Sequence, residues 1–241
     1  MPVSGGVIAG ERKPVILTDS GKTIIKLSNN ANTIEKSKYL ITQYDVIDVN
    51  IKTNIIVVAA KNKTYIKTLS SDFSQEYDYA MANDIVDVAV SQCQDNFYWV
   101  LFSNQLKQIR LESGVATIIS SVSIPFIGIP KGVKHDYHGN GAVVYSNKEI
   151  FKINDLGTAI NWQNSSFEDI VDIAVSQEIS KIYTEQFKYD LLSTKSMAFD
   201  SFRNKMWWLA NDEKPKLCSV DLSNYSASLV DMELSEIIFK S

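Results

Sequence analysis

The sequence predicts an all-β fold, a single β-propeller of about six four-stranded blades, with five blades as the alternative. Four similar segments begin at Leu27, Leu69, Leu111 and Ile153, so each starts 42 residues after the one before. The residues between them alternate between apolar and polar, which is typical of strands and not of helices. A strand-based repeat of about 40 residues has the length of one propeller blade. The 241 residues hold a little under six such repeats.

One domain is expected to span residues 1–241, because all-β barrels and propellers of this length form a single unit. Regular blades are expected over about residues 1–165. The register of the repeat is lost after Ile153. Irregular blades and a closing segment are therefore expected over about residues 166–241.

Each repeat predicts the order strand, loop, strand, tight turn, strand, turn and strand. In the third repeat, which shows this order most clearly, strands are expected at residues 84–91, 97–102, 106–111 and 115–120. Pairs of strands joined by a polar turn are expected at residues 15–27, 57–69 and 143–153. The turn positions hold Ser, Asn, Asp, Gly or Lys, which accept a left-handed backbone or stay hydrated.

The last third of the chain departs from this pattern. A hairpin is expected at residues 181–193, and a new unit opens at residues 196–210. Either the fifth blade lacks its outer strand or residues 183–192 are an insertion. A terminal strand often closes such a ring and hides its edge, and the candidates are residues 5–10 and 235–241. The C-terminal tail also has the apolar spacing of a helix, so strand and helix both stay open there.

The segment AFDSFRNKMWWLAND, residues 198–212, is followed by an apolar strand and the turn-like SNYSAS. This unit resembles the generic β-propeller repeat of WD-repeat, YVTN and related proteins. The resemblance extends over nearly the whole chain but is limited to the repeat pattern, because the Gly-His and Trp-Asp dipeptides of true WD repeats are absent. It implies the fold and no particular activity, since propellers include enzymes, lectins and scaffolds.

The composition is that of a packed globular protein, with 45% hydrophobic and 22% charged residues. Lys and Arg number 24 against 28 Asp and Glu, a net charge of −4, so no basic excess is present to neutralise nucleic-acid phosphates. Neither a leader peptide nor an apolar run of membrane-spanning length is recognisable, so we expect no membrane contact and a chain that is intracellular when synthesised.

The two cysteines, Cys93 and Cys218, match no metal-binding or redox spacing. A chain of this size needs no covalent cross-link for stability. Both are therefore expected to be free, buried thiols.

A D-x-x-D motif recurs at the predicted first strand of three repeats, ending in Asp48, Asp87 and Asp172. The copy expected near residue 127 lacks the acids. If each motif begins the innermost strand of its blade, the carboxylates converge at one mouth of the central channel, where they could hold a cation such as calcium. The alternative is that each aspartate caps its own loop by accepting backbone N–H bonds, which requires no ligand.

Both histidines, His135 and His138, flank Asp136 in one short segment. Imidazole and carboxylate are metal ligands, but the set is incomplete without a further donor. The same groups could act as general acid and base, although no nucleophile motif accompanies them. A solvated loop between strands is the alternative.

Residues 20–23, Ser-Gly-Lys-Thr, imitate the end of a phosphate-binding P-loop. That motif requires a glycine five residues before Gly21, where this chain has Ile16. A hairpin turn is expected there instead.

Adjacent Trp207 and Trp208 must point to opposite faces of a strand. Both faces of an interior blade are covered, so both tryptophans could belong to the core. A partner-contact role for one of them is the alternative.

No complete catalytic set is present. The sequence therefore favours a non-catalytic scaffold or structural subunit that binds other proteins without a cofactor, as in a large assembly such as a phage virion or tail. The alternative is a ligand-binding or hydrolytic propeller with a cation or small-molecule site at the channel mouth. Its candidate metal ligands are Asp48, Asp87, Asp172, His135 and His138, and the oligomeric state stays open.

Overall fold

A computed structural model describes much of the chain. The described residues are 4–8, 13–18, 21–28, 33–50, 52–136, 141–153, 159–163, 170, 172–175, 182–184, 194–200, 205–211, 215–221 and 232–233. Side chains are described within residues 13–153, with the same gaps, and at residues 170, 172, 173 and 175.

The described residues form strands and no helix, as the repeat predicted. The first sheet contains β1 Ser4–Ile8, β2 Lys13–Thr18, β3 Thr23–Leu27 and β4 Ile34–Tyr39. The second contains β5 Val46–Val49, β6 Ile56–Ala59, β7 Tyr65–Leu69 and β8 Glu76–Ala80. The third contains β9 Asp87–Val90, β10 Phe97–Leu101, β11 Gln105–Glu112 and β12 Val115–Ser123.

The remaining sheets follow in chain order. The fourth contains β13 Pro130–Asp136, β14 Gly141–Ser146, β15 Ile150–Ile153 and β16 Ala159–Gln163. The fifth is described over β17 Ile173–Val175 and β18 Ile182–Thr184. The sixth contains β19 Thr194–Asp200, β20 Lys205–Asn211, β21 Pro215–Asp221 and β22 Met232–Glu233.

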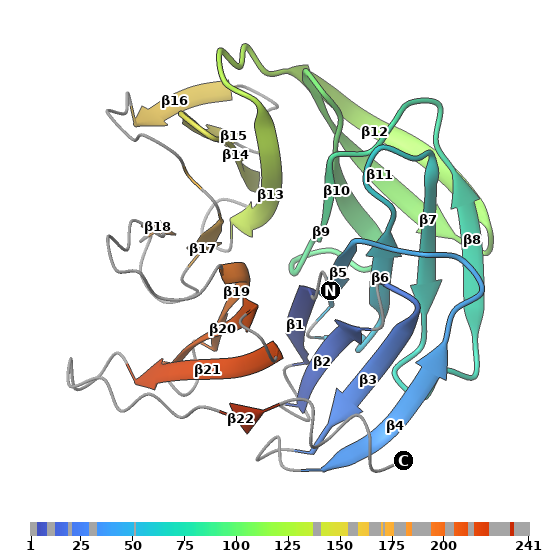
Figure 1. Ribbon diagram of the computed structural model, residues 1–241. Coiled ribbons are helices and arrows are strands. Elements are labelled where there is room, and N and C mark those ends of the chain that lie inside the picture. The colour runs from blue at the N-terminus through green and yellow to red at the C-terminus, as the bar shows by residue number, and fades with distance from the viewer. Residues whose placement is uncertain are drawn as a thin grey trace.

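Every sheet is an antiparallel meander in which each strand pairs with the next along the chain. The first strands contact one another in a closed cycle, from β1 through β5, β9, β13, β17 and β19 back to β1. Figure 1 shows these first strands on the inside of the ring and β4, β8 and β12 on its outer rim. The protein is a β-propeller, and the number of blades stays a prediction.

The core lies between neighbouring sheets. Adjacent Val57 and Val58 on β6 are both fully buried but point to opposite faces. Val57 joins the apolar cluster shared with the third sheet, and Val58 joins the one shared with the first. Burying each such side chain contributes about 1.5–3 kcal/mol. This packing on both faces explains why the inner strands are almost continuously apolar, whereas the outer strands are not.

In the third sheet, two predicted strand limits differ from the structure by three residues, and the others by at most one. β9 begins at Asp87 and not at residue 84, because the N–H of Ile85 donates to the carbonyl of Lys63 in the preceding sheet (2.8 Å) before the strand begins. β12 continues to Ser123, beyond the predicted end at residue 120.

The terminal segments belong to their own sheets in the described part of the chain. Residues 5–8 of the predicted closing segment lie in β1, which pairs with β2, so this candidate for closing the last sheet is wrong. The short β22 pairs with β21 in the sixth sheet. Residues 235–241, the other candidate, lie outside the described residues.

Gly21 forms the hairpin turn that was predicted in place of a P-loop. The N–H groups of Gly21 and Lys22 both donate to the carbonyl oxygen of Thr18 (3.0 Å each). Gly21 has a φ of +85°, and its carbonyl accepts the N–H of Tyr44 (2.9 Å). The turn therefore also anchors the chain that enters the second sheet.

Candidate functional site at the ring centre

The aspartates Asp48, Asp87 and Asp172 all lie on or just before a first strand, as the sequence predicted. Asp48 is on β5, Asp87 begins β9, and Asp172 precedes β17. Because side chains alternate between the two faces of a strand, each aspartate points away from its apolar neighbours. Ile47 and Val49, beside Asp48, pack toward the first sheet, so the Asp48 side chain faces the third.

Two of these aspartates join their own sheet to the next one. Asp48 Oδ2 accepts the N–H of Val90 on β9 (2.8 Å), and its Oδ1 accepts the N–H of Val49 (2.8 Å). Asp87 Oδ2 accepts the N–H of Val133 on β13 (2.8 Å). A first strand is the inner edge of its sheet and leaves some N–H groups without a strand partner. The aspartates satisfy these groups and link consecutive sheets.

Asp45, the first aspartate of its D-x-x-D motif, has a different kind of partner. Asp45 Oδ2 accepts the N–H of Lys61 within its own sheet (3.0 Å), as expected for a loop cap. Asp169 lies outside the described residues. The capping interpretation therefore fits Asp45, whereas Asp48 and Asp87 bond to a neighbouring sheet.

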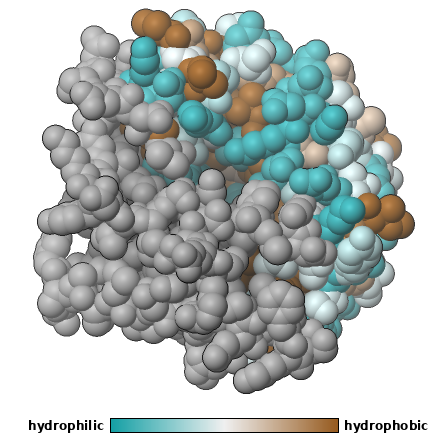
Figure 2. All heavy atoms as spheres, in the orientation of Figure 1, coloured by the Kyte–Doolittle hydropathy of each residue, from teal (hydrophilic) through white to brown (hydrophobic). Residues whose placement is uncertain are grey.

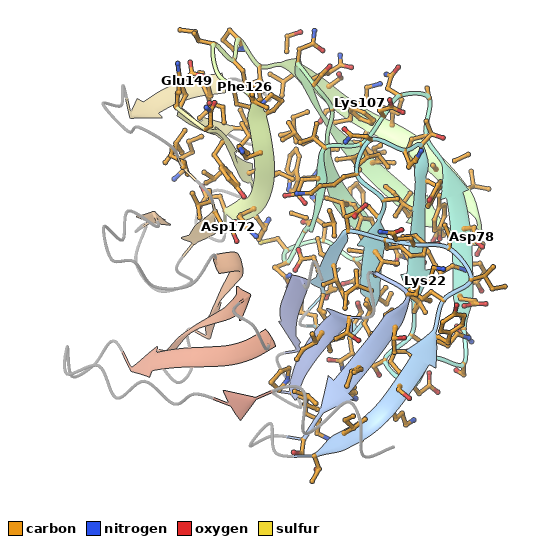
Figure 3. All side chains as sticks on the ribbon, viewed as in Figure 1. Lys22, Asp78, Lys107, Phe126, Glu149 and Asp172 are labelled. Atoms are coloured by element: carbon orange, nitrogen blue, oxygen red, sulfur yellow. The ribbon has the colours of Figure 1, made fainter. Side chains whose placement is uncertain are left out.

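Lys134 lies on β13, a first strand that lacks the acidic motif. Its Nζ lies 3.5 Å from Asp172 Oδ1, and the same oxygen accepts the hydroxyl of Tyr145 (2.7 Å) and the N–H of Ile173 (2.8 Å). Figure 3 shows Asp172 on the inner side of the ring, beside β13. The fourth sheet thus supplies a cation where the second, third and fifth sheets supply an acid.

The pKa shifts show that these groups interact electrostatically. Burial alone would lower the pKa of Lys134, but the nearby Asp172, Asp87 and Asp48 outweigh it and hold that pKa above its usual value. Burial raises the pKa of Asp48 to about 6, against the opposing effects of the Val90 N–H and Lys134. Burial also raises the pKa of Asp87. Lys134 therefore stays charged and partly compensates the carboxylates.

Tyr145 completes this cluster as a neutral donor. Burial, followed by the charges of Asp172 and Asp87, raises the pKa of its hydroxyl well above the usual value. Gly132 allows the close packing, because a Cβ there would lie 2.5 Å from the Tyr145 hydroxyl oxygen and 2.6 Å from Asp87 Oδ2. Three residues of this cluster were not predicted from the sequence: Gly132, Lys134 and Tyr145. The only available signal was the lysine in the repeat without acids.

Asp48 is expected to make stability depend on pH. Its folded pKa of about 6 exceeds the value of about 4 for an unfolded aspartate, so the folded state holds this proton more tightly. The resulting stabilisation is complete below about pH 4 and is lost as the pH rises through about 6.

Urea unfolding at several pH values, compared with Asp48→Asn, measures this effect. Asparagine does not titrate. Between pH 4 and pH 7 the free energy of unfolding of the wild type should therefore fall by about 1–3 kcal/mol relative to that of the variant. A difference that stays constant across this range would show that Asp48 is not a buried, titrating carboxyl group.

The histidine segment is placed elsewhere. His135, near the end of β13, is 5% exposed, and its Nε2 lies 3.5 Å from Sγ of Cys93. Burial lowers the pKa of His135 to about 4, so the imidazole is neutral at pH 7. Asp136 Oδ2 pairs with Lys152 (2.9 Å), and His138 lies outside the described residues. The loop interpretation is wrong for His135, because strand pairing extends through Asp136.

No group of three His, Cys, Asp or Glu side chains with metal-binding geometry occurs among the described residues. Within that part of the chain, the predicted ligands divide into the Asp48, Asp87 and Asp172 cluster and the separate His135. The metal-site hypothesis stays a prediction.

Cys93 is a free thiol, but it is exposed, so the expectation of burial is wrong for this residue. It lies in the β9–β10 turn, where strand pairing ends. The backbone of Cys218 lies in β21, opposite Trp208.

Trp207 and Trp208 lie in β20. Their backbones pair with Ala198 and Met197 of β19. Their side chains are outside the described set, so the choice between core and partner contact stays a prediction.

Comparisons with known proteins identify the fold but no family. No family model matches the sequence, and no curated protein matches it. A streptogramin B lyase structure aligns with a TM-score of 0.65 at 12% identity, over 97% of this chain and 83% of that one. A catalytically inactive virginiamycin B lyase from Staphylococcus aureus with quinupristin gives 0.65 at 11%, over 97% and 85%.

Hydrazine synthase from Kuenenia stuttgartiensis aligns with a TM-score of 0.57 at 10% identity, over 97% of this chain and 66% of that one. Such low identities show the fold alone. The described residues contain no helix long and apolar enough to cross a membrane. The resemblance to WD and YVTN repeats in particular stays a prediction. The comparisons support the conclusion that this chain is a β-propeller protein.

Proposed function

We propose that this chain is a non-catalytic β-propeller that serves as a structural, protein-binding subunit. The observation that carries the proposal is the use of the ring-centre carboxylates as links between sheets. Asp48 and Asp87 accept main-chain N–H groups of the next sheet, and Asp172 is occupied by Tyr145, Lys134 and Ile173. Groups with these partners hold the ring together and leave little capacity for a substrate.

The β12–β13 loop, residues 124–129, offers a surface for such a partner. Ile127 is 88% exposed and Ile129 is 67% exposed. Figure 2 shows hydrophobic atoms at the outside of the described part, over the end where this loop connects its strands. Two large apolar side chains exposed on one short loop make it the candidate protein contact of this proposal.

The loop is held rigidly by a buried carboxylate. Glu149 Oε2 accepts the N–H groups of Ile127 (2.9 Å) and Gly128 (3.0 Å), and Asn147 Oδ1 accepts the N–H of Ile129 (2.8 Å). A Cβ at Gly128 would overlap with the Asn147 side chain. Because the loop is already ordered, binding through it loses little conformational entropy.

Phe126 anchors the base of the loop. Its ring packs edge to face against Phe151, with centroids 5.5 Å apart. Figure 3 shows Phe126 and Glu149 close together beside β13. Phe126 therefore packs into the core, whereas Ile127 and Ile129 are exposed to solvent.

Replacing both exposed isoleucines, Ile127→Asp with Ile129→Asp, is expected to abolish partner binding without lowering the melting temperature. The side chains contact mainly solvent, so the fold does not depend on them. Affinity purification of tagged wild type and variant from the native host, with quantitative mass spectrometry, measures the loss. Tyr39→Asp, on exposed β4, is the control. Equal recovery of every partner by both proteins would refute the loop as the binding surface.

A large assembly such as a phage virion or tail is the setting that this proposal favours, because a rigid ring with a preformed apolar loop suits a fixed subunit. Co-sedimentation of the chain with intact particles, and its loss in the loop variant, would support that setting.

A second candidate function is ligand binding or hydrolysis at the channel mouth. Its support is the convergence of three carboxylates near Lys134 and the existence of lyases among proteins of this fold. Lys134 counts against it, since the ammonium already occupies the position of a bound cation.

A further inference from the structure

The outer strand β12 differs in charge from the other outer strands whose side chains are described. β4 contains Glu35, Lys36 and Lys38, and β8 contains Glu76 and Asp78. β12 has no charged residue in nine positions and is the longest of the three. Nearly its whole length is exposed.

One edge of β12 has no strand partner in the described part of the chain. The strand is last in its sheet and pairs only with β11. Such an edge offers main-chain N–H and C=O groups to any other strand, and proteins normally protect it with charges, prolines or bulges. β12 has neither charge nor proline. It has one bulge, at Ile119, because Gln108 pairs with Ser120 whereas Ile109 pairs with Ile118.

We infer that β12 is the contact strand of a symmetric dimer, in which it pairs antiparallel with β12 of a second copy of this chain. The two third sheets then form one continuous sheet across the two-fold axis.

The strand is complementary to itself. Ile118 and Ile119, 57% and 49% exposed, lie at its middle, so a two-fold axis there places the isoleucines of both copies against each other. The Val115 end of one copy then lies opposite the serine-rich end of the other, whose small side chains allow close approach. Pairs of apolar residues across antiparallel strands contribute about 0.2–1 kcal/mol each.

Charge favours a second copy as the occupant of this edge. Neither strand carries charge. On the neighbouring β11, Arg110 and Glu112 pair at 2.8 Å, and the Lys107 ammonium lies 5.0 Å from the centre of the Phe102 ring. β8 differs from β12 because it carries two acids, Glu76 and Asp78, which form ion pairs with Lys38 and Lys67. A contact through one strand is small, so the dimer is expected to be weak and reversible.

Sedimentation equilibrium of the full chain over a range of concentrations tests the dimer. The wild type should approach twice the monomer mass and stop there, whereas Ile119→Lys should stay monomeric at the same melting temperature. Tyr39→Lys, at an exposed site on β4, should dimerise like the wild type. A wild type that is monomeric throughout, a dimer unaffected by Ile119→Lys, or growth beyond twice the mass would overturn the inference.

Oxidative cross-linking tests the antiparallel register. Ile119→Cys should form a covalent dimer with oxidised glutathione, because residues near the two-fold axis come within disulfide distance. Val115→Cys should not, since its counterpart lies at the far end, and the parent chain with its own two cysteines is the control. Equal cross-linking of the two variants would contradict antiparallel pairing. The loop variant at Ile127 and Ile129 should dimerise normally, which separates this result from the proposed partner binding.

Discussion

Replacing Lys134 with methionine is expected to lower the free energy of unfolding by about 2–4 kcal/mol at pH 7. The substitution keeps the length of the side chain but removes the ammonium 3.5 Å from Asp172 and near Asp48 and Asp87. Asp48 and Asp172 then lose this cation, and Asp87 keeps only the attraction of Lys61. The expected cost lies below that of breaking a fully buried ion pair because the lysine side chain is 31% exposed.

Urea unfolding followed by circular dichroism measures this loss. Lys38→Met is the matched control, since Lys38 pairs with Glu76 at 3.4 Å on the surface, and its removal should cost at most about 1 kcal/mol. The loss in Lys134→Met should shrink at pH 5, where Asp48 is protonated. Equal stability of the two lysine variants at pH 7 would show that Lys134 does not hold the ring centre together.

Replacing Gly21 with alanine is expected to destabilise the protein by about 2–5 kcal/mol. The backbone there has a φ of +85°, and an added Cβ would overlap with the backbone carbonyl oxygen of Tyr44. A backbone atom held between two sheets cannot move aside like the end of a flexible side chain. The turn or the entry into β5 must shift.

Gly114→Ala separates the two causes of this loss. Gly114 has a similar φ of +82°, but a Cβ there would meet no atom within 4 Å. It should cost only the backbone penalty of about 1–2 kcal/mol. Thermal unfolding of both variants gives the comparison, and equal losses would mean that the Tyr44 contact has no energetic effect.

The repeat predicted the fold because each sheet uses the same strand order and buries both faces. Val57 and Val58 illustrate the limit of this signal, since a fully apolar pair indicates a buried strand but not which neighbouring sheet each residue contacts. The start of β9 was predicted at Asp84 and lies at Asp87, because the N–H of Ile85 donates to a carbonyl of the preceding sheet. Such a non-local hydrogen bond leaves no local pattern in the sequence.

At the ring centre, the spacing of Asp48, Asp87 and Asp172 correctly placed these residues on or beside first strands. The partners of Asp48 and Asp87 could not be predicted, because they include backbone N–H groups of the next sheet, which any residue type supplies. Lys134 could be related to these acids only after the ring brought β13 beside them. The support of the β12–β13 loop by Glu149 likewise joins residues about 20 positions apart through main-chain donors.

Calcium titration of the wild type tests most directly whether the ring-centre carboxylates are structural links and not a cation site. Thermal unfolding is measured from calcium-free buffer up to about 10 mM calcium, above the dissociation constants of weak protein sites. We predict an unchanged melting temperature, because Lys134 and main-chain N–H groups already occupy the carboxylates. A rise of several degrees that disappears in Asp87→Asn would contradict this account and favour a cation-binding propeller.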